Sequence, residues 1–275
     1  MRFFRTPKGL LTIVLVLLAA VSAPAEGVGQ VWPGFVAAVG AAMIVDAPIL
    51  RVRNGAWEFP SGALLTGMIV AMILSPREPW RVTALTAAIG VVSKYVARTR
   101  SANVFNPAAL ALVITFYLFD TAQNWWGALS DVAPYALILL FATGGFIADR
   151  VNKVPIVLAF LGAYYTLFTI TSFAADPVRV VEIYRPPDLN AALFFAFFIL
   201  TDPPTSPVRY LPQIVCGILV AAVSYAVFEW IGAAHYLLAG VLAGNLWEAW
   251  RRWRMVSSGT ASEEKPWDLS RWKRL

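Results

Sequence analysis

The stretch ILTDPPTSPVRY (199–210) interrupts an apolar segment of membrane type. The apolar run 191–200 stops at Thr201 and Asp202, passes through three prolines, and is followed by a second apolar run. Earlier in the chain, LLTGMIVAMILSPREPW (64–80) has the same plan, a short apolar segment that ends at a proline. Proline and the residue before it disfavour helix, so both stretches predict broken helices. A matched break in each half indicates the inverted repeat of many transport proteins.

Composition places the whole chain in a membrane. It has 275 residues, of which 59% are hydrophobic, and a mean hydropathy of +0.66. Apolar runs of membrane length recur throughout, and no polar stretch is long enough for a separate soluble domain. Runs such as VCGILVAAVSYAVF do not alternate as outer-membrane strands do. We therefore predict an all-α integral membrane protein.

The apolar runs predict about ten transmembrane helices, five in each half of an inverted repeat. The expected spans are 10–24, 31–49, 61–75, 80–97, 104–119, 133–149, 154–172, 189–201, 211–230 and 234–250. The repeats cover about 10–119 and 133–250, inside a membrane domain of residues 1–255. A cytoplasmic tail of residues 256–275 follows.

The basic residues lie in loops and predict the orientation. With the N-terminus inside, all but four of the 22 lysines and arginines fall on the cytoplasmic side. The positive-inside rule then predicts a multi-pass inner-membrane protein with both termini cytoplasmic, and the net charge of +6 reflects topology, not nucleic-acid binding. The first run, ending in AAVSAPAEG, also resembles a cleavable signal peptide. The need for five spans in each half favours its retention.

The sequence limits the redox chemistry available to this chain alone. A single cysteine, Cys216, and a single histidine, His235, exclude an internal disulfide, paired-histidine haem and an iron–sulfur cluster held only here. We find no nucleotide-binding loop and no zinc spacing. A redox carrier, if there is one, is organic or comes from a partner.

Polar residues at membrane depth are the candidate site, because such residues usually pair or handle a ligand. They are Lys94, Asn106, Pro107, Thr201, Asp202, Thr205, Ser206 and Asn245. Asp202 has a second interpretation, in which it caps the loop that follows. Lys94 is also interpretable as an interfacial lysine. Asp46, a further carboxylate in the second span, is a candidate for an ion path.

Five motifs in order along the chain resemble one known family. They are SGALLTGMIVAMILSPREPW (61–80), SKYVARTRSANVFNPAALAL (93–112), ADRVNKVPIVLAFLGA (148–163), FFILTDPPTSPVRYLPQIVCGILV (197–220) and AGVLAGN (239–245). They are similar to the RnfD component of the Rnf electron-transport complex and to the NqrB component of the sodium-translocating NADH:quinone reductase. The resemblance implies a ten-helix subunit of a flavin-based redox complex that couples electron transfer to sodium or proton movement. It also implies other membrane redox subunits and quinone as partners, beside the lipid bilayer.

The family's covalent flavin motif is missing here. Family members carry FMN on a threonine of an SGAT-like motif in the outer loop after the fifth span. The corresponding loop reads FDTAQNWWGALSDVAPY (119–135), with Thr121 as its only threonine, and the second such element has become DLNAALFF (188–195). Covalent FMN is therefore not expected. Non-covalent riboflavin or FMN is the expectation, with donors from Asn106, Thr201, Thr205, Ser206 and Asn245.

Three functions stay open at this point. The first is a membrane subunit of a flavin-based electron-transport system. The second is a small-solute or ion transporter, or a channel, of the same inverted-repeat shape without a redox role. The third is an accessory membrane protein of a biosynthetic pathway. The element TDPPTS favours the first, whereas the missing threonine motif favours the others.

Overall fold

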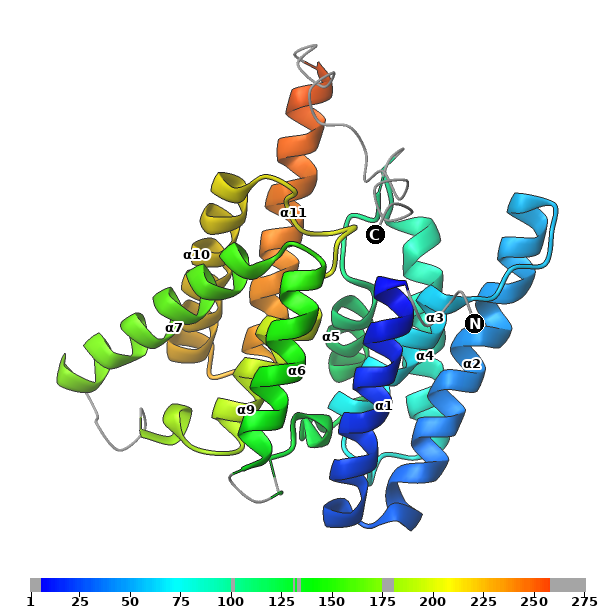
Figure 1. The fold of residues 1–275 in the computed structure, drawn as a ribbon, viewed down its shortest axis with the longest axis horizontal. Helices are drawn as coiled ribbons and strands as arrows, with labels where there is room; N and C mark the ends of the chain where they lie inside the picture. The colour runs from blue at the N-terminus through cyan, green and yellow to red at the C-terminus, as the bar shows by residue number, and fades with distance from the viewer. Residues whose placement is uncertain (1–5, 100–101, 131, 133–134, 175–180, 258–275) are drawn as a thin grey trace.

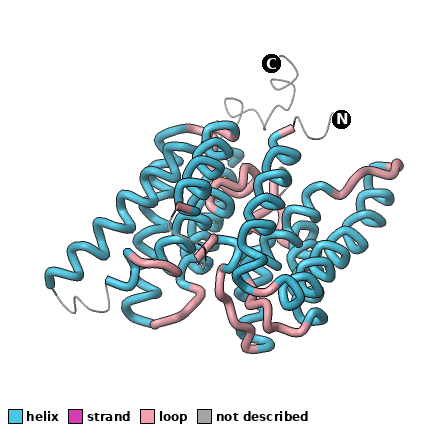
Figure 2. The backbone as a smooth tube through the Cα atoms, turned by 60° about the horizontal axis from the view of Figure 1, so that its bottom comes forward, coloured by secondary structure: helices cyan, strands magenta, loops and turns pink. Residues whose placement is uncertain are grey.

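The computed structural model describes residues 6–99, 102–130, 132, 135–174 and 181–257, and these residues are almost entirely helical (Figure 1, Figure 2). The α-helices are α1 (Pro7–Glu26), α2 (Val28–Asn54), α3 (Ser61–Ile73), α4 (Trp80–Val96), α5 (Pro107–Phe119), α6 (Ala136–Arg150), α7 (Val154–Ala174), α9 (Asp188–Phe194), α10 (Tyr210–Ala226) and α11 (Tyr236–Ser257). Shorter helical segments are η2 (Trp126–Ala128), η3 (Glu182–Tyr184), η4 (Phe195–Ile199) and η5 (Val227–Ile231). No strand occurs in the described ranges, so the predicted all-α class is confirmed.

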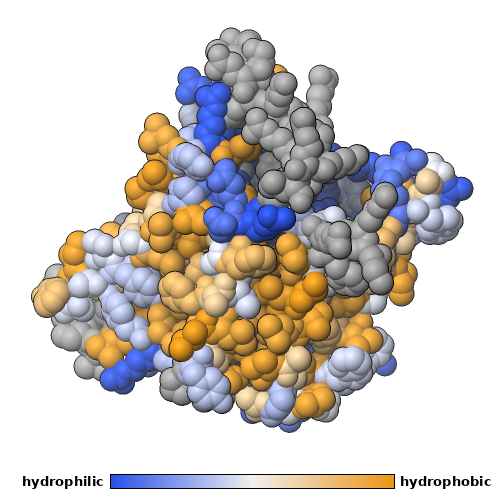
Figure 3. Space-filling view, in the orientation of Figure 1, coloured by the Kyte–Doolittle hydropathy of each residue, from blue (hydrophilic) through white to orange (hydrophobic). Residues whose placement is uncertain are grey.

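Several helices have the length and composition of membrane spans. Within the described residues, four reach that standard: α1, α2, Val154–Phe173 of α7, and Tyr210–Ile231, which joins α10 to η5. Three shorter apolar segments are Ser61–Ile73, Pro107–Phe119 and Asp188–Ile199. Side chains on the visible face are largely hydrophobic across its middle, and hydrophilic ones gather toward its ends (Figure 3). The chain is thus an integral membrane protein, as its composition predicts.

Two helix boundaries differ from the prediction for identifiable reasons. The fifth helix begins at Pro107 instead of residue 104, because Asn106 is its N-cap and accepts a hydrogen bond from Ala109 N at 3.0 Å. The last helix continues to Ser257, past the predicted span end at 250 and the predicted domain end at 255, because nothing in WRRWRMVS breaks a helix. The rest of the predicted tail, residues 258–275, lies outside the described residues.

Both predicted interruptions occur. Helix α3 ends at Ile73, where Leu74 turns to extended backbone, and α4 begins at Trp80. In the second half α9 runs directly into the π-helical segment η4, which ends at Ile199, and α10 begins at Tyr210. Each break comes shortly before a proline, as expected from the steric clash that proline imposes on the preceding residue.

Small residues let the long helices pack closely. A Cβ atom on Gly67 of α3 would lie 2.8 Å from Ala38 O of α2, and one on Gly217 of α10 would lie 2.6 Å from Ile156 O of α7. A Cβ on Gly240 of α11 would lie 2.8 Å from Val220 O of α10. In a membrane such small residues allow the dispersion contacts that hold helices together.

Loop contacts separate into two sets, here called inner and outer after the predicted topology. At the outer end, Ser75 N donates to Ala122 O at 2.9 Å, and Asn124 Nδ2 donates to Glu26 Oε1 at 3.3 Å. At the inner end, Asn245 Nδ2 donates to Thr205 O at 3.1 Å. Helix α1 begins and α11 ends on the same side of the molecule (Figure 1).

Candidate functional site

The turn that joins η4 to α10 is closed by its own hydrogen bonds. The Asp202 carbonyl accepts from Thr205 N at 3.2 Å, from Ser206 N at 3.1 Å and from Ser206 Oγ at 2.8 Å. The Asp202 carboxylate accepts from Thr205 Oγ1 at 3.0 Å. Thr201 Oγ1 donates back to Phe197 O at 2.6 Å. The backbone of Asp202, not its carboxylate, thus caps the loop, and one carboxylate oxygen keeps no hydrogen bond from a described residue.

Two asparagines fix this turn to helices from both halves of the chain. Asn106 N donates to Asn245 Oδ1 at 2.8 Å, Asn106 Nδ2 donates to Ile199 O at 3.4 Å, and Asn245 Nδ2 donates to Thr205 O at 3.1 Å. Both asparagines are buried, and Pro107 is buried beside them as the first residue of α5. Seven of the eight predicted site residues therefore lie together around the break, although Asn106 and Asn245 are 139 positions apart.

Further side chains, which the sequence did not single out, hold the remaining carbonyl groups of the turn. Lys153 Nζ donates to Ser206 O at 3.2 Å and to Pro207 O at 2.5 Å. Arg252 donates to Pro204 O at 2.8 Å and to Ser206 O at 3.1 Å, and Gln213 Nε2 donates to Val208 O at 3.0 Å. A non-helical turn inside a membrane protein needs such donors, because unsatisfied peptide groups cost several kcal/mol in hydrocarbon. Gln213 was detectable as an isolated amide in an apolar helix.

Glu248 organises the arginine at this turn. The residue is 1% exposed, and its carboxylate accepts from Arg252 Nε at 2.6 Å and from Arg251 Nε at 2.7 Å. Two guanidinium groups on one buried carboxylate make charge-assisted hydrogen bonds of the stronger kind. The ion pair with Glu248 orients the Arg252 guanidinium toward the turn, where it donates to the carbonyl groups. Spacing of three and four residues on one helix face brings the three side chains together.

Burial shifts the pKa of two charged groups at the turn, Asp202 and Lys153. Burial raises the pKa of the Asp202 carboxyl above its ordinary value, although the Thr205 hydrogen bond and Lys8, Lys153 and Lys94 act in the opposite direction. Burial lowers the pKa of Lys153 to about 8, although Glu248 and Asp202 act to raise it. None of the three lysines forms a direct ion pair with Asp202 in the described part of the chain. The three ammonium groups thus attract the Asp202 carboxylate electrostatically, but none of them is in direct contact with it.

Lys94 belongs to a neighbouring charged pair and not to the turn itself. Its Nζ lies 3.5 Å from Asp46 Oδ1, and the Tyr95 hydroxyl donates to the same oxygen at 2.6 Å. Asp46 is 3% exposed, in the middle of an apolar helix. A buried carboxylate in a membrane helix requires such partners. The structure therefore gives Lys94 a structural partner, while it interacts with Asp202 only at longer range.

Comparison with known proteins identifies the group to which this chain is related. The model of the NQR2, RnfD, RnfE family matches residues 5–142. A relative from Halorhodospira halophila, named as a subunit of an ion-translocating oxidoreductase complex, is 34% identical over 82% of this chain and 83% of its own. The chain belongs to the NQR2, RnfD, RnfE family.

Other relatives carry the same name at lower similarity or over a shorter alignment. The protein from Rhodobacter capsulatus is 25% identical over 82% of each chain. The protein from Citrobacter koseri is 30% identical, but the alignment spans 47% of this chain and 39% of that relative. The similarity is thus most extensive with the Halorhodospira and Rhodobacter proteins and partial with the Citrobacter protein.

The residues predicted to hold a flavin are largely engaged in hydrogen bonds within the protein. Thr121 is 1% exposed, and its buried Oγ1 has no hydrogen-bond partner among the described residues. At the turn, the amide NH₂ groups of Asn106 and Asn245 and the hydroxyls of Thr201, Thr205 and Ser206 all donate to groups of the protein itself. These side chains stabilise the broken helix in this conformation: the hydroxyl donors are engaged, whereas each amide has a second N–H besides the one that donates here.

Proposed function

We propose that this chain is a membrane subunit of an ion-translocating electron-transport system of the Rnf type. The observation that carries the proposal is the turn around Asp202, an acidic break in an apolar helix, in a chain of this family. Relatives that align over most of its length are named as subunits of an ion-translocating oxidoreductase complex. Other membrane subunits would then be its partners. The electron donor and acceptor would be supplied by that assembly.

We infer that the two halves form an inverted repeat in the inner membrane, with both termini cytoplasmic. Two helix pairings recur in the two halves, which supports this. In the first half α2 packs most extensively on α4, and α4 on α5; in the second half α7 packs on α10, and α10 on α11. Helix α3 and the pair α9 and η4 are the broken members. An inverted repeat puts such breaks near a shared axis, where transport proteins bind their cargo.

The charged groups at the inner end are the proposed ion-handling elements. Asp202 keeps an oxygen without a partner among the described residues, and the buried Asp46–Lys94 pair lies within electrostatic range of the same region. Ionisable groups inside a membrane protein mark ion or proton pathways in most cases. In this proposal Asp202 takes the moving cation, and the lysines limit how long it stays, because their charge opposes that of the cation.

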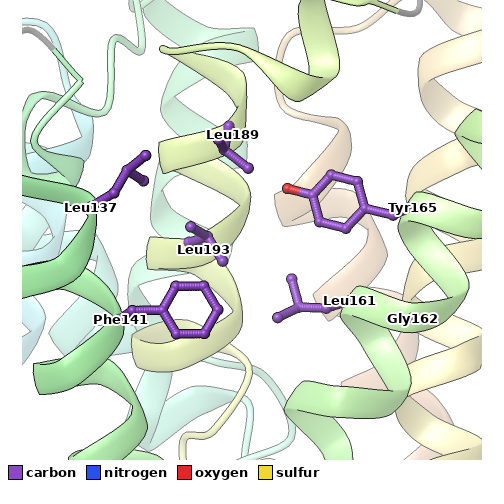
Figure 4. A pocket seen from close by; sticks show the side chains of 7 residues that line it. All are labelled: Leu137, Phe141, Leu161, Gly162, Tyr165, Leu189 and Leu193. Carbon is purple, nitrogen blue, oxygen red and sulfur yellow. The ribbon is translucent and has the colours of Figure 1, made fainter. Parts of the chain in front are cut away.

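Any flavin or quinone of the system is proposed to bind this chain non-covalently, away from the donors that hold the turn. An apolar groove of about 460 Å³ between α6, α7 and α9 supports the quinone part of this proposal (Figure 4). Its lining is almost wholly apolar and includes Phe141, Leu161 and Leu193. Leu189 and Leu193 belong to the helix that continues into η4, so the floor of the groove is the broken helix itself.

The test compares Asp202→Asn with Asp120→Asn in membranes that contain the whole complex. Asparagine retains an acceptor for Thr205 but removes the charge. We expect electron-driven ion uptake to fall about tenfold in the Asp202→Asn variant, while the amount of folded protein stays the same. A tenfold change corresponds to an interaction free energy of about 1.4 kcal/mol between the cation and the carboxylate. Asp120 lies at the outer end of α5 and is exposed, so its variant should behave as the wild type. Equal uptake in both variants would remove Asp202 from the ion path.

A transporter or channel without a redox role is the second candidate. The engaged hydroxyl donors at the turn and the buried Thr121 favour it, since neither offers an exposed, free hydroxyl to a flavin. The purified chain separates the two candidates. A visible spectrum that never gains a flavin band on addition of riboflavin or FMN, together with solute or ion flux that needs no electron donor, would support the transporter and contradict the redox role.

A further inference from the structure

A second hollow, of about 650 Å³, lies at the inner end of the molecule where two membrane helices begin. It is bounded by the turn after α6 and by the first turns of α7 and α10. Three of its residues are polar, namely Asp149, Asn152 and Tyr210; Pro155, Leu158 and Ile214 supply apolar walls. The hollow is therefore amphipathic, unlike the apolar groove of Figure 4, whose lining holds no charged side chain.

The polar end of the hollow contains side-chain groups that can form further hydrogen bonds. The Asp149 carboxylate is exposed and forms no ion pair with another described residue. Tyr210 donates its hydroxyl to Asn152 Oδ1 at 3.3 Å, which orients the amide. Asn152 Nδ2 then remains a donor without a partner in the described ranges. An anionic acceptor and an amide donor thus both line the hollow.

The apolar end continues into the surface that the bilayer covers. Leu158 is 64% exposed, and Ile214 is 40% exposed. Both lie about one turn inside helices that are long and apolar enough to cross a membrane, Val154–Phe173 and Tyr210–Ile231. The first turn of such a helix lies at the boundary between headgroups and acyl chains. An occupant of this hollow meets polar groups at the boundary and hydrocarbon below it.

We propose that this hollow binds one phospholipid with a primary ammonium headgroup, such as phosphatidylethanolamine, from the leaflet on the side of the termini. The ammonium group donates charge-assisted hydrogen bonds to Asp149, and Asn152 Nδ2 donates to the phosphate or ester oxygens. One acyl chain lies against Leu158 and Ile214. A choline headgroup carries the same charge but has no N–H to donate, so it binds more weakly. The proposal is independent of the redox role.

The test is a lipid titration of the full-length protein in detergent, followed by native mass spectrometry. We expect phosphatidylethanolamine to bind about tenfold more tightly than phosphatidylcholine of the same chains, since a charge-assisted hydrogen bond is worth about 1.4 kcal/mol or more. Asp149→Asn should remove this preference. Glu58→Gln, which neutralises an exposed carboxylate at the same end of the molecule, should leave it unchanged.

A second pair of variants tests the apolar wall. Ile214→Trp fills the hollow and should lower the affinity for both lipids, whereas Ile218→Trp, one turn further along α10 and outside the hollow, should not. Retained preference in Asp149→Asn, or equal loss in both tryptophan variants, would overturn the proposal. So would an Ile214→Trp chain that keeps its lipid but loses another protein from the complex, because the hollow would then hold a partner helix.

Discussion

Replacing Lys153 by methionine should change how the stability of the protein depends on pH. Lys153 is 1% exposed, and its Nζ donates to Ser206 O and Pro207 O. Burial lowers its pKa from 10.5 to about 8. Below pH 8 the amine is protonated in both the folded and unfolded chain, and folding bears the full cost of burying the charge. Between pH 8 and 10.5 the unfolded chain binds the extra proton, so the free energy of unfolding rises with pH.

The magnitude follows from the two pKa values. The full shift corresponds to about 3 kcal/mol, of which about 2 kcal/mol falls between pH 7 and pH 9.5. Methionine removes this dependence. It also leaves Pro207 O without its donor, at about 1–3 kcal/mol, whereas Ser206 O keeps Arg252. Relief of the buried charge offsets that loss at neutral pH, so Lys153→Met should be near neutral at pH 7 and destabilising by about 2 kcal/mol at pH 9.5.

Denaturant titration in detergent at the two pH values, followed by tryptophan fluorescence, measures this difference. Lys8→Met is the matched control, because Lys8 is exposed and its removal changes the net charge by the same amount. The control should follow the wild type at both pH values. If the unfolding free energies of the wild type and Lys153→Met changed in parallel with pH, the reasoning would be refuted. It would also be refuted if the wild type lost stability relative to the variant as the pH rises, because the predicted change has the opposite sign.

Two further substitutions test the packing around the break. Asn245→Ala removes the partners of Asn106 N and Thr205 O and should cost about 2–4 kcal/mol of unfolding free energy, whereas the exposed Asn54→Ala should change it by less than about 0.5 kcal/mol. Similar values for the two would show that the asparagine bridge contributes little. Gly240→Ala places a Cβ 2.8 Å from Val220 O and should destabilise by about 1–3 kcal/mol, whereas Gly145→Ala has open space and should stabilise by about 0.5–1 kcal/mol in the same titration. Equal signs for the two glycines would contradict the packing of α10 on α11.

The helix boundaries illustrate how local chemistry is readable from sequence. The breaks near Pro76 and Pro203 follow from the geometry of proline, which acts on its immediate neighbours and needs no tertiary contact. The start of α5 was predicted three residues early because Asn106 was interpreted as part of the span instead of its cap. An N-cap is defined by the backbone N–H that bonds to its side chain. The sequence indicates such a cap only through a pattern such as Asn followed by Pro.

The sequence by itself determined that this chain is helical, lies in a membrane and has two interrupted segments, because hydropathy and proline act over a few neighbouring residues. It also selected seven residues that lie together at the break. Only the tertiary structure decided what those residues do. Their hydrogen bonds hold the turn and its neighbouring helices together, helped by Lys153, Gln213, Glu248 and Arg252. A hydrogen bond between residues more than a hundred positions apart, such as that of Asn106 with Asn245, depends on how whole helices pack. Composition cannot specify that packing.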